Sequence, residues 1–332
     1  MKKIGLVFFA LLMFSQASAT DNRYKDTLLK SIKGTGFNGV LLLSQKGKVL
    51  LHENIGFADK DKQMPINDEH LFSPGSVGKE FTTVSIMQLV ADKKLRYYDK
   101  ISHFITGLPK GSENITVEHI LTHTSGLPRI KWKKNIQTSE VIEQIKNSKI
   151  QFEPGRGYLY SNLNVILRAL LVEKITEKPY IDFLNKSIFK IASMNASYQQ
   201  ETKGKESKNK VYGDYPTYLK GVSIYVTPED LLKFENALNK GQLVDFAEIE
   251  RFLPGDKLSG KDNRAYFDFG RYYTSEEGKL KYWEHDGSNP NHHTLKHHNF
   301  EQDYTIILMS SDGNKSTLYE IRNNIVKLLS SK

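Results

Sequence analysis

The chain has 332 residues, no cysteine and a net charge of +9. Without cysteine it cannot be held by disulfides or act through a thiol, so a buried core must supply its stability, and the chain is long enough for one. The positive excess is scattered apart from one dense run at 203–210. We interpret this run as a solvated loop and expect no nucleic-acid partner, because no binding motif accompanies it.

Residues 1–19 predict a secretory signal. Lys2 and Lys3 precede an apolar stretch from Ile4 to Phe14, and Ala17-Ser18-Ala19 forms a small-residue cleavage site. The apolar stretch is short for a bilayer span, and a retained membrane anchor is the alternative. We therefore expect an exported, periplasmic or secreted protein with no stable membrane span after signal removal.

The expected secondary structure follows hydrophobic periodicity and turn signals. The expected strands lie at 39–44, 49–57, 266–273, 279–284, 294–298 and 304–309. The expected helices lie at 21–33, from Ser76 onward, at 117–122, at 161–174, from Thr227 onward and at 319–329. Thr227-Pro228-Glu229-Asp230 is a particularly clear helix start, with a capping threonine, proline in the first turn and two acidic residues.

This order of elements predicts an α/β fold of the α+β type. Strands from both ends of the chain would form one antiparallel sheet flanked by helices, and the middle would form a mostly helical lobe. We expect residues 20–332 to be one domain with two lobes sharing a cleft. The sheet lobe would comprise 20–84 and 261–332, and the helical lobe 85–260.

A serine followed three residues later by a lysine is the most informative local pattern. Ser-x-x-Lys occurs at Ser76, Ser187 and Ser207. Only Ser76 follows a Pro-Gly break and begins a helical pattern, so Lys79 would lie one turn away on the same face. A helix N-terminus supplies partial positive charge and free N–H groups, which favour an alkoxide. Ser76 is therefore a candidate nucleophile and Lys79 a candidate base.

Two further patterns follow along the chain. Tyr160-Ser161-Asn162 places a phenol and an amide at the start of a helix, and Tyr-x-Asn occurs once in the sequence. His285-Asp286-Gly287 follows a predicted strand, where glycine permits close approach of a ligand to the backbone. Each pattern alone also has an ordinary structural explanation: a buried tyrosine with a capping asparagine, and a turn after an edge strand.

The string Leu121-Thr122-His123-Thr124-Ser125-Gly126-Leu127-Pro128 is longer and more distinctive. It has no obvious nucleophile geometry, so we interpret His123 as a structural hydrogen-bonding residue. The histidines at 292, 293, 297 and 298 raise the question of a metal site. On a strand, adjacent histidines point to opposite faces, and no cysteine or dense carboxylate cluster joins them. We expect these histidines at the surface or cleft edge, and no metal.

Together and in this order, the patterns resemble the serine β-lactamase and penicillin-binding-protein superfamily. The closest resemblance is to its class C β-lactamase-like branch, which includes D,D-carboxypeptidases, D-aminopeptidases and esterases. Ser-x-x-Lys matches at Ser76 and Lys79, Tyr-x-Asn at Tyr160 and Asn162, and the Lys/His-x-Gly element at His285 and Gly287. The strings at 121–128 and 226–231 are also typical of this branch.

The resemblance implies a mechanism. Ser76 would attack a carbonyl and form an acyl-enzyme, while Lys79 and Tyr160 would share the proton between Ser76 and the leaving group. Asn162 would hydrogen-bond the substrate amide or the lysine. The backbone N–H groups of Ser76 and Ser288 would form an oxyanion hole. The resemblance implies no cofactor.

The third motif departs from the usual Lys-Thr-Gly of the lactamases. Histidine is cationic only part of the time near neutral pH, so a grip of His285 on a β-lactam carboxylate would be weak or pH-dependent. We therefore predict a serine hydrolase acting on a small ester or a D-amino-acid peptide, which could derive from the cell wall. The alternatives are a β-lactamase or D,D-carboxypeptidase acting on β-lactams or peptidoglycan stem peptides, and, from another class, a catalytically silent envelope-binding protein.

Overall fold

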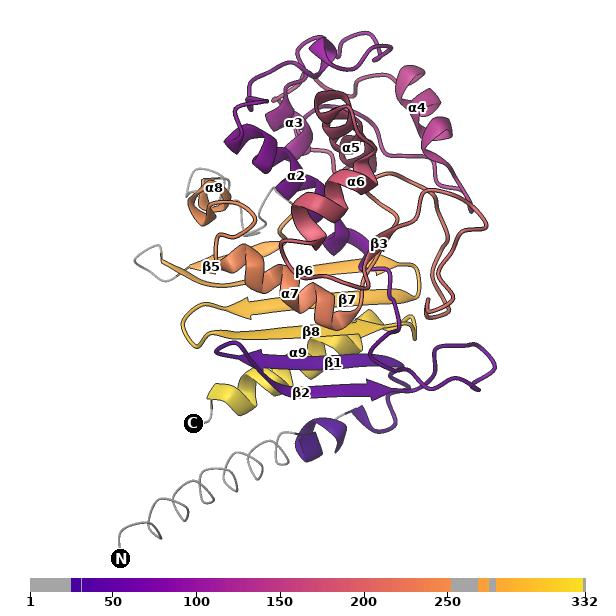
Figure 1. The fold of residues 1–332 in the computed structure, drawn as a ribbon, viewed down its shortest axis with the longest axis vertical. Helices are drawn as coiled ribbons and strands as arrows, with labels where there is room; N and C mark the ends of the chain where they lie inside the picture. Colours follow the sequence, from indigo (N-terminus) through magenta and orange to yellow (C-terminus); the bar gives the residue numbers. More distant parts are fainter. Residues whose placement is uncertain (1–24, 31, 252–267, 275–278, 331–332) are drawn as a thin grey trace, which may run out of the picture.

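The computed structural model describes residues 25–30, 32–251, 268–274 and 279–330 (Figure 1). The predicted signal at 1–19 lies outside the described residues, as do the first residues of the helix expected at 21–33 and of the strand expected at 266–273. Within the described ranges, no helix is both long enough and apolar enough to cross a membrane.

One six-stranded antiparallel sheet joins the two ends of the chain and forms the lower part of the molecule in Figure 1. Its strand order is β2-β1-β8-β7-β6-β5. The strands are β1 (Gly39–Gln45), β2 (Lys48–Ile55), β5 (Arg271–Thr274), β6 (Leu280–Asn289), β7 (His292–Asn299) and β8 (Tyr304–Ser310). A separate pair, β3 (Tyr198–Gln199) and β4 (Ile224–Tyr225), forms a small second sheet. The predicted fold class is confirmed.

Helices occupy both faces of the large sheet and the space above it (Figure 1). The α-helices are α2 (Lys79–Ala91), α3 (Val117–Leu121), α4 (Thr138–Lys146), α5 (Asn162–Thr176), α6 (Tyr180–Leu184), α7 (Pro228–Asn239), α8 (Phe246–Glu250) and α9 (Lys315–Ser330). Shorter turns are the 3-10 helices η1 (Gly75–Gly78) and η2 (Ile101–His103) and the π-helix η3 (Asn185–Phe189). As predicted, α7 is capped by Thr227, whose side chain accepts from the backbone N–H of Asp230.

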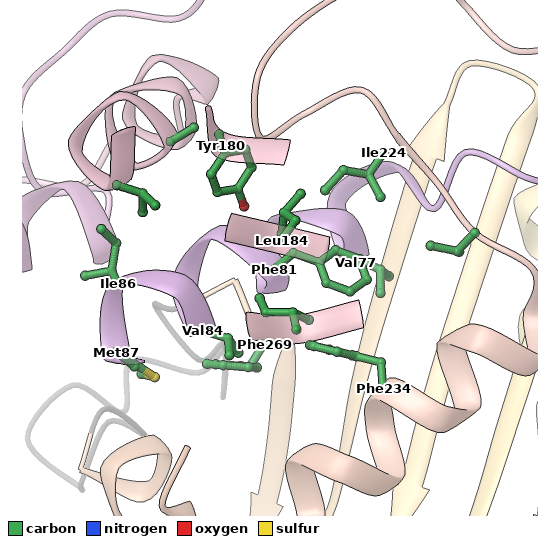
Figure 2. Packing of buried hydrophobic residues seen from close by; sticks show 14 of the residues in the cluster. Val77, Phe81, Val84, Ile86, Met87, Tyr180, Leu184, Ile224, Phe234 and Phe269 are labelled. Carbon is green, nitrogen blue, oxygen red and sulfur yellow. The ribbon is translucent and has the colours of Figure 1, made fainter. Parts of the chain in front are cut away.

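The sheet is buried on both faces, which explains the continuous apolar run in β1. Val40 and Leu42 belong to one apolar cluster, whereas Leu41 and Leu43 belong to the other. The second cluster includes residues of α9 and of the segment at 28–37. The first cluster lies between the sheet and the helices shown in Figure 2.

Helix α2 runs through the middle of this first cluster. Phe81 packs against Phe234 of α7, with ring centroids 4.5 Å apart, and side chains all around α2 are buried (Figure 2). An enclosed helix needs no apolar stripe, because every face contacts protein. The packing fixes the start of α2, and η1, directly before it, carries Ser76.

The largest differences from the predicted strand boundaries are in β5 and β6. Residues 268–270 are not in a strand, and β5 begins at Arg271. β6 does not end at Glu284 but continues to Asn289, because residues 285–289 remain paired with β7. The His285-Asp286-Gly287 motif therefore lies within a paired strand and not in a turn after one. The division into lobes at 84/85 and 260/261 remains a prediction.

Candidate active site

The turn before α2 presents Ser76 to solvent at the edge of the buried core. Gly75 has φ of +58°, a conformation that glycine adopts without steric cost. The chain then enters η1, where Ser76 is half-buried while Val77 and Gly78 are buried. The backbone N–H of Ser76 lies in the first helical turn, where no intrahelical acceptor exists.

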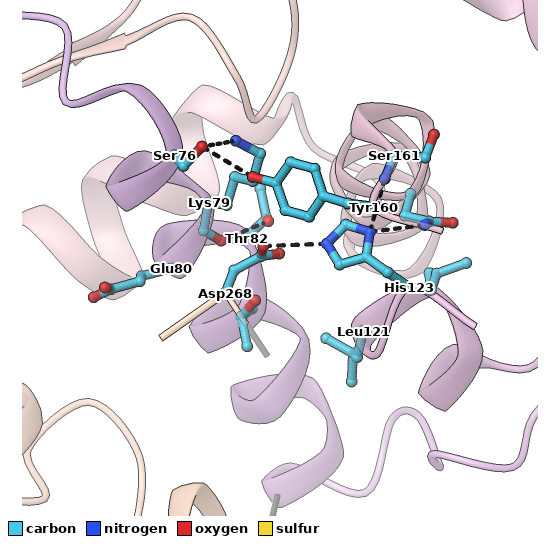
Figure 3. A network of polar contacts seen from close by, with 12 residues as sticks. Ser76, Lys79, Glu80, Thr82, Leu121, His123, Tyr160, Ser161 and Asp268 are labelled. Carbon is cyan, nitrogen blue, oxygen red and sulfur yellow. Dashed lines mark hydrogen bonds and ion pairs between the residues drawn. The ribbon is translucent and has the colours of Figure 1, made fainter. Parts of the chain in front are cut away.

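Ser76, Lys79 and Tyr160 come together as the sequence predicted (Figure 3). Lys79 Nζ donates to Ser76 Oγ at 3.0 Å, and the Tyr160 hydroxyl donates to the same oxygen at 2.9 Å. Lys79 is only 5% exposed, and its Nζ lies 5.2 Å from the centre of the Tyr160 ring. Ser76 Oγ therefore has two neighbours that can exchange a proton with it, the buried Lys79 and the half-buried Tyr160.

Gly287 and Gly75 allow β6 and η1 to approach more closely than side chains would permit. A Cβ at Gly287 would lie 2.0 Å from the carbonyl oxygen of Pro74 and 2.7 Å from the nitrogen of Ser76. A Cβ at Gly75 would lie 2.3 Å from the nitrogen of Ser288. The backbone nitrogens of Ser76 and Ser288 therefore both lie at this close contact between η1 and β6, where the predicted oxyanion hole requires them.

Replacing Gly287 with alanine is expected to lower kcat by roughly 10²–10³-fold, the cost of losing one oxyanion donor. The added methyl group must push β6 away from η1 and separate the two amides. Steady-state ester hydrolysis would measure this loss, with circular dichroism to confirm folding. Gly78→Ala is the matched control, because a Cβ there would approach nothing closer than 3.2 Å. A folded Gly287→Ala protein with unchanged kcat would remove Gly287 from the site.

Asn162 begins α5, directly after the helix cap at Ser161, whose side chain accepts from the N–H of Leu163. Asn162 Oδ1 is buried and has no hydrogen-bond partner within the described parts of the chain. The predicted alternative, a bond to Lys79, is not among the hydrogen bonds of Lys79, which contacts Ser76. Because the side chain lines a cavity beside Ser76, its oxygen is available to a substrate N–H.

His285 lies on β6 and is 8% exposed. Its Nδ1 is 2.6 Å from Oε1 of Glu80, the residue that follows Lys79 in α2. Sequence reasoning identified His285 but missed Glu80, because nothing in the local pattern distinguishes that glutamate from a solvated residue.

A buried network behind Tyr160 holds that residue in place (Figure 3). The His123 ring lies 4.6 Å from the Tyr160 ring, and His123 Nδ1 accepts the N–H of Ser161 at 3.2 Å. On its other side, His123 Nε2 is 3.1 Å from Asp268, which also pairs with Arg168. Although burial alone would raise the pKa of Asp268, Arg168 and His123 hold it well below its usual range.

These contacts assign His123 a defined protonation state. Its Nδ1 accepts hydrogen bonds, so Nε2–H donates to Asp268 and the ring is neutral. Burial lowers the pKa of His123, in agreement with this assignment. His123 is therefore a hydrogen-bonding residue that supports Tyr160, as the sequence indicated.

The expectation that the histidines of β7 lie at the surface is wrong. His292, His293, His297 and His298 are all buried, because β7 is an inner strand of a sheet that is covered on both faces. Each has a polar partner instead of solvent; His293, for example, contacts the Ser288 hydroxyl at 2.9 Å. Among the residues that the structure places, no group of histidine and carboxylate side chains has the arrangement of a metal site.

Two cavities meet at Ser76 and Tyr160. The first, of about 400 Å³, is bordered by Lys79, Asn162 and Ser288 and by the aromatic side chains of Trp132 and Tyr215. Lys79 is the one charged residue in its described lining.

The second cavity, of about 580 Å³, contains His285 and three cationic side chains, Arg129, Arg271 and Lys315. Lys315 pairs with Asp286. Arg129 and Arg271 form no salt bridge with any residue in the described ranges, and both are exposed. Three carboxylates, Asp268, Glu284 and Asp286, line the same cavity. A substrate spanning Ser76 would thus meet a largely neutral surface on one side and a surface with charges of both signs on the other.

Comparison with known proteins identifies relatives of this arrangement. A family model described as Beta-lactamase matches residues 26–329. The chain is 27% identical to Penicillin-binding protein 4* of Bacillus subtilis (strain 168), covering 86% of this chain and 70% of that protein.

Two solved structures share the fold. A penicillin binding protein from Bacillus halodurans superimposes with a TM-score of 0.78 at 20% identity, covering 91% of this chain and 98% of the other. D-amino acid amidase from Ochrobactrum anthropi SV3, complexed with L-phenylalanine amide, gives a TM-score of 0.75 at 20% identity, covering 93% and 99%.

Proposed function

Because the chain belongs to the Beta-lactamase family, we propose that it is an exported enzyme that forms an acyl-enzyme on Ser76 and acts on an ester or a D-amino-acid peptide. Its membership makes it a serine hydrolase of the β-lactamase and penicillin-binding-protein type. The observation that carries the finer proposal is the position of Ser76 Oγ, within hydrogen-bond distance of both Lys79 Nζ and the Tyr160 hydroxyl.

The proposed reaction has two steps. Ser76 Oγ attacks the carbonyl carbon as its proton passes to whichever of Lys79 and Tyr160 is deprotonated, and the carbonyl oxygen binds the amides of Ser76 and Ser288. The bond to the leaving group then breaks, and the leaving group receives that proton. Water repeats the sequence on the acyl-enzyme, releasing the acid and returning the proton to Ser76.

The contents of the two cavities support an assignment of the substrate. We place the acyl portion in the first cavity, where Trp132 and Tyr215 supply apolar surface and Asn162 can accept an amide N–H. The leaving group would then lie in the second cavity, beside His285. The D-amino acid amidase among the structural neighbours is compatible with a D-amino-acid substrate, although it shares 20% identity and therefore only the fold.

One observation favours a second candidate, a D,D-carboxypeptidase or β-lactamase. Both kinds of substrate carry a carboxylate, and guanidinium groups bind carboxylates with two parallel hydrogen bonds. Arg129 and Arg271 lie in the proposed leaving-group cavity without a salt-bridge partner in the described ranges. The D-Ala-D-Ala peptide, whose leaving group is anionic, therefore belongs in the same experiment as the neutral ester.

The test combines turnover with intact mass. The purified protein is incubated separately with p-nitrophenyl acetate, a D-Ala-D-Ala peptide and a fluorescent penicillin. Ester or peptide turnover supports the main proposal, stable penicillin on Ser76 without turnover favours a penicillin-binding peptidase, and rapid penicillin hydrolysis favours a lactamase. If the protein is neither labelled by nor turns over any of the three compounds, the proposal is overturned. The mass of protein recovered from an export host would test removal of residues 1–19.

A further inference from the structure

A buried network of charged side chains lies behind His285. Glu80 contacts His285 through Oε1, at 2.6 Å from Nδ1, and Lys296 through Oε2, at 2.6 Å from Nζ. Lys296 Nζ also lies 2.5 Å from Glu235, whose other oxygen accepts from Trp283 Nε1. Glu80 and Glu235 are fully buried, and Lys296 is 1% exposed.

The network joins α2, the helix that follows Ser76, to β6, the strand that carries His285. Lys79 and Glu80 are consecutive in α2, but Lys79 contacts Ser76 and Glu80 contacts His285. Lys296 of β7 is the cross-strand partner of His285 on β6, and Glu235 comes from α7. Three other elements, α2, β7 and α7, therefore supply the network behind His285.

The charges within this network do not balance without His285. Burial alone would lower the pKa of Lys296, but Glu235 and Glu80 raise it, so its ammonium stays charged. Burial alone would raise the pKa of Glu235, but Lys296 holds it below its usual range. One buried ammonium thus faces two carboxylates, and an uncompensated buried charge is costly. A proton on His285 restores neutrality.

The other carboxylates around His285 already have partners. Asp286, the next residue in β6, pairs with Lys315 of α9 and accepts from the hydroxyl of Tyr319. Asp268, across the second cavity, pairs with Arg168 of α5. Glu284, the residue before His285, pairs with Arg322. Each of these three carboxylates has its own cation, whereas Glu80 contacts the His285 ring directly.

The other cations around His285 are exposed to solvent or have contacts of their own. Arg129 and Arg271 face the same cavity from exposed positions, where water and salt screen their charge. Lys79 is directed to Ser76. His298 of β7 lies near Glu235, but burial lowers its pKa and keeps it neutral.

We propose that Glu80 keeps His285 protonated, so that His285 presents Nε2–H to the second cavity as a permanent positive donor for a carboxylate on the leaving group. Glu80 is then a positioning residue that acts through His285. This inference rests on the proposed function for placing the leaving group in that cavity, but not for the protonation state itself. It differs from the sequence expectation that the charge of this histidine follows the pH of the solution.

Nitrogen NMR of protein labelled with ¹⁵N-histidine tests the protonation state without any substrate. We expect the His285 ring, assigned with His285→Lys, to be an imidazolium at pH 7.5 in the wild type and neutral in Glu80→Gln. Asp230→Asn is the matched control, because Asp230 of α7 is also a buried helix carboxylate, but it accepts hydrogen bonds from the backbone amides of residues 195–197. A neutral His285 ring in the wild type at pH 7.5 would overturn the inference, whatever the enzyme hydrolyses.

Kinetics test its consequence. For the D-Ala-D-Ala peptide, Glu80→Gln is expected to lower kcat/KM roughly tenfold at pH 8, mainly through KM, and to recover toward pH 6 as acid protonates His285. A lysine at position 285 would stay charged from pH 6 to pH 8. Glu80→Gln should therefore have little effect on kcat/KM in a His285→Lys background. An equal loss at pH 6 and pH 8, in both backgrounds, would show a purely structural role for Glu80. If no substrate is turned over, the NMR result still decides the inference, and only the proposed function fails.

Discussion

Replacing Ser76 with alanine is expected to lower kcat/KM for the ester by at least about 10⁴-fold, the scale seen when a catalytic nucleophile is removed. Alanine leaves the two adjacent amides and both cavities in place, so it removes the covalent step while substrate can still bind. The residual rate would come from binding and oxyanion stabilisation alone. Intact mass should show no acyl or penicilloyl adduct on the variant.

The chain supplies matched controls for this experiment. Ser187 and Ser207 each precede a lysine by the same three residues, but neither lines the cavities beside Tyr160. Ser187 lies in the π-helix η3, and the hydroxyl of Ser207 accepts the N–H of Asn209 in a loop. Ser187→Ala and Ser207→Ala should therefore retain turnover and labelling. Turnover that persists in Ser76→Ala would instead disprove the nucleophile assignment.

The reacting groups could be predicted from the sequence because each belongs to a short, local pattern. Ser76 and Lys79 are separated by one helical turn, so their spacing alone brings amine and hydroxyl to one face. Tyr160 and Gly287 were identified by resemblance and by order along the chain. The Tyr160 hydroxyl lies 2.9 Å from Ser76 Oγ, in agreement with that identification, whereas the close approach of Gly287 to the turn at Ser76 was not predicted.

The residues that support this site could not be predicted in the same way. Arg168 and Asp268 are 100 residues apart, and Glu80 and Lys296 are 216 residues apart. No periodicity relates such pairs, because they meet only after the sheet has joined the two ends of the chain. Their burial is also unexpected by composition, since charged residues are almost never fully buried unless they are paired.

The polar strand β7 shows the same limit. Its sequence, from His292 to Asn299, contains one strongly apolar residue, Leu295, and therefore predicts an exposed strand. The structure buries it as an inner strand, because hydrogen bonds and ion pairs replace apolar contacts. The pattern of polar and apolar residues along the sequence shows which side chains are polar. It does not show which of them will form hydrogen bonds or ion pairs in the fold.

Acidification from pH 7.5 to pH 5 is expected to destabilise the fold through His123 and His292. Burial lowers the pKa of both from the ordinary value of 6.5. Each Nδ1 accepts a backbone N–H, that of Ser161 for His123 at 3.2 Å and that of Ser73 for His292 at 2.9 Å. Protonation of either Nδ1 would point its new N–H at the backbone N–H that it now accepts. Protonation is therefore unfavourable in the folded state.

The sign of the effect follows from which state binds the proton. Because the folded pKa is lowered, the unfolded chain takes up protons first as the pH falls below 6.5. The stabilisation is complete above that value and is lost below it. If neither ring takes up a proton in the folded state, each histidine lowers the free energy of unfolding by about 2 kcal/mol at pH 5. The pair then lowers it by about 4 kcal/mol. That loss is a large part of a typical folding free energy of about 5–15 kcal/mol.

Urea unfolding between pH 7.5 and pH 5 measures this loss, and His292→Asn isolates one contribution. Asparagine keeps an acceptor for the N–H of Ser73 but cannot titrate, so the free energy of unfolding should fall less steeply, by up to about 1.4 kcal/mol per pH unit. His103→Asn, at an exposed position, should leave the slope unchanged. An unaltered slope in His292→Asn would contradict the assignment. The two N–H groups belong to Ser73, three residues before Ser76, and to Ser161, directly after Tyr160. Loss of these hydrogen bonds should therefore impair catalysis at a higher pH than that at which the protein unfolds.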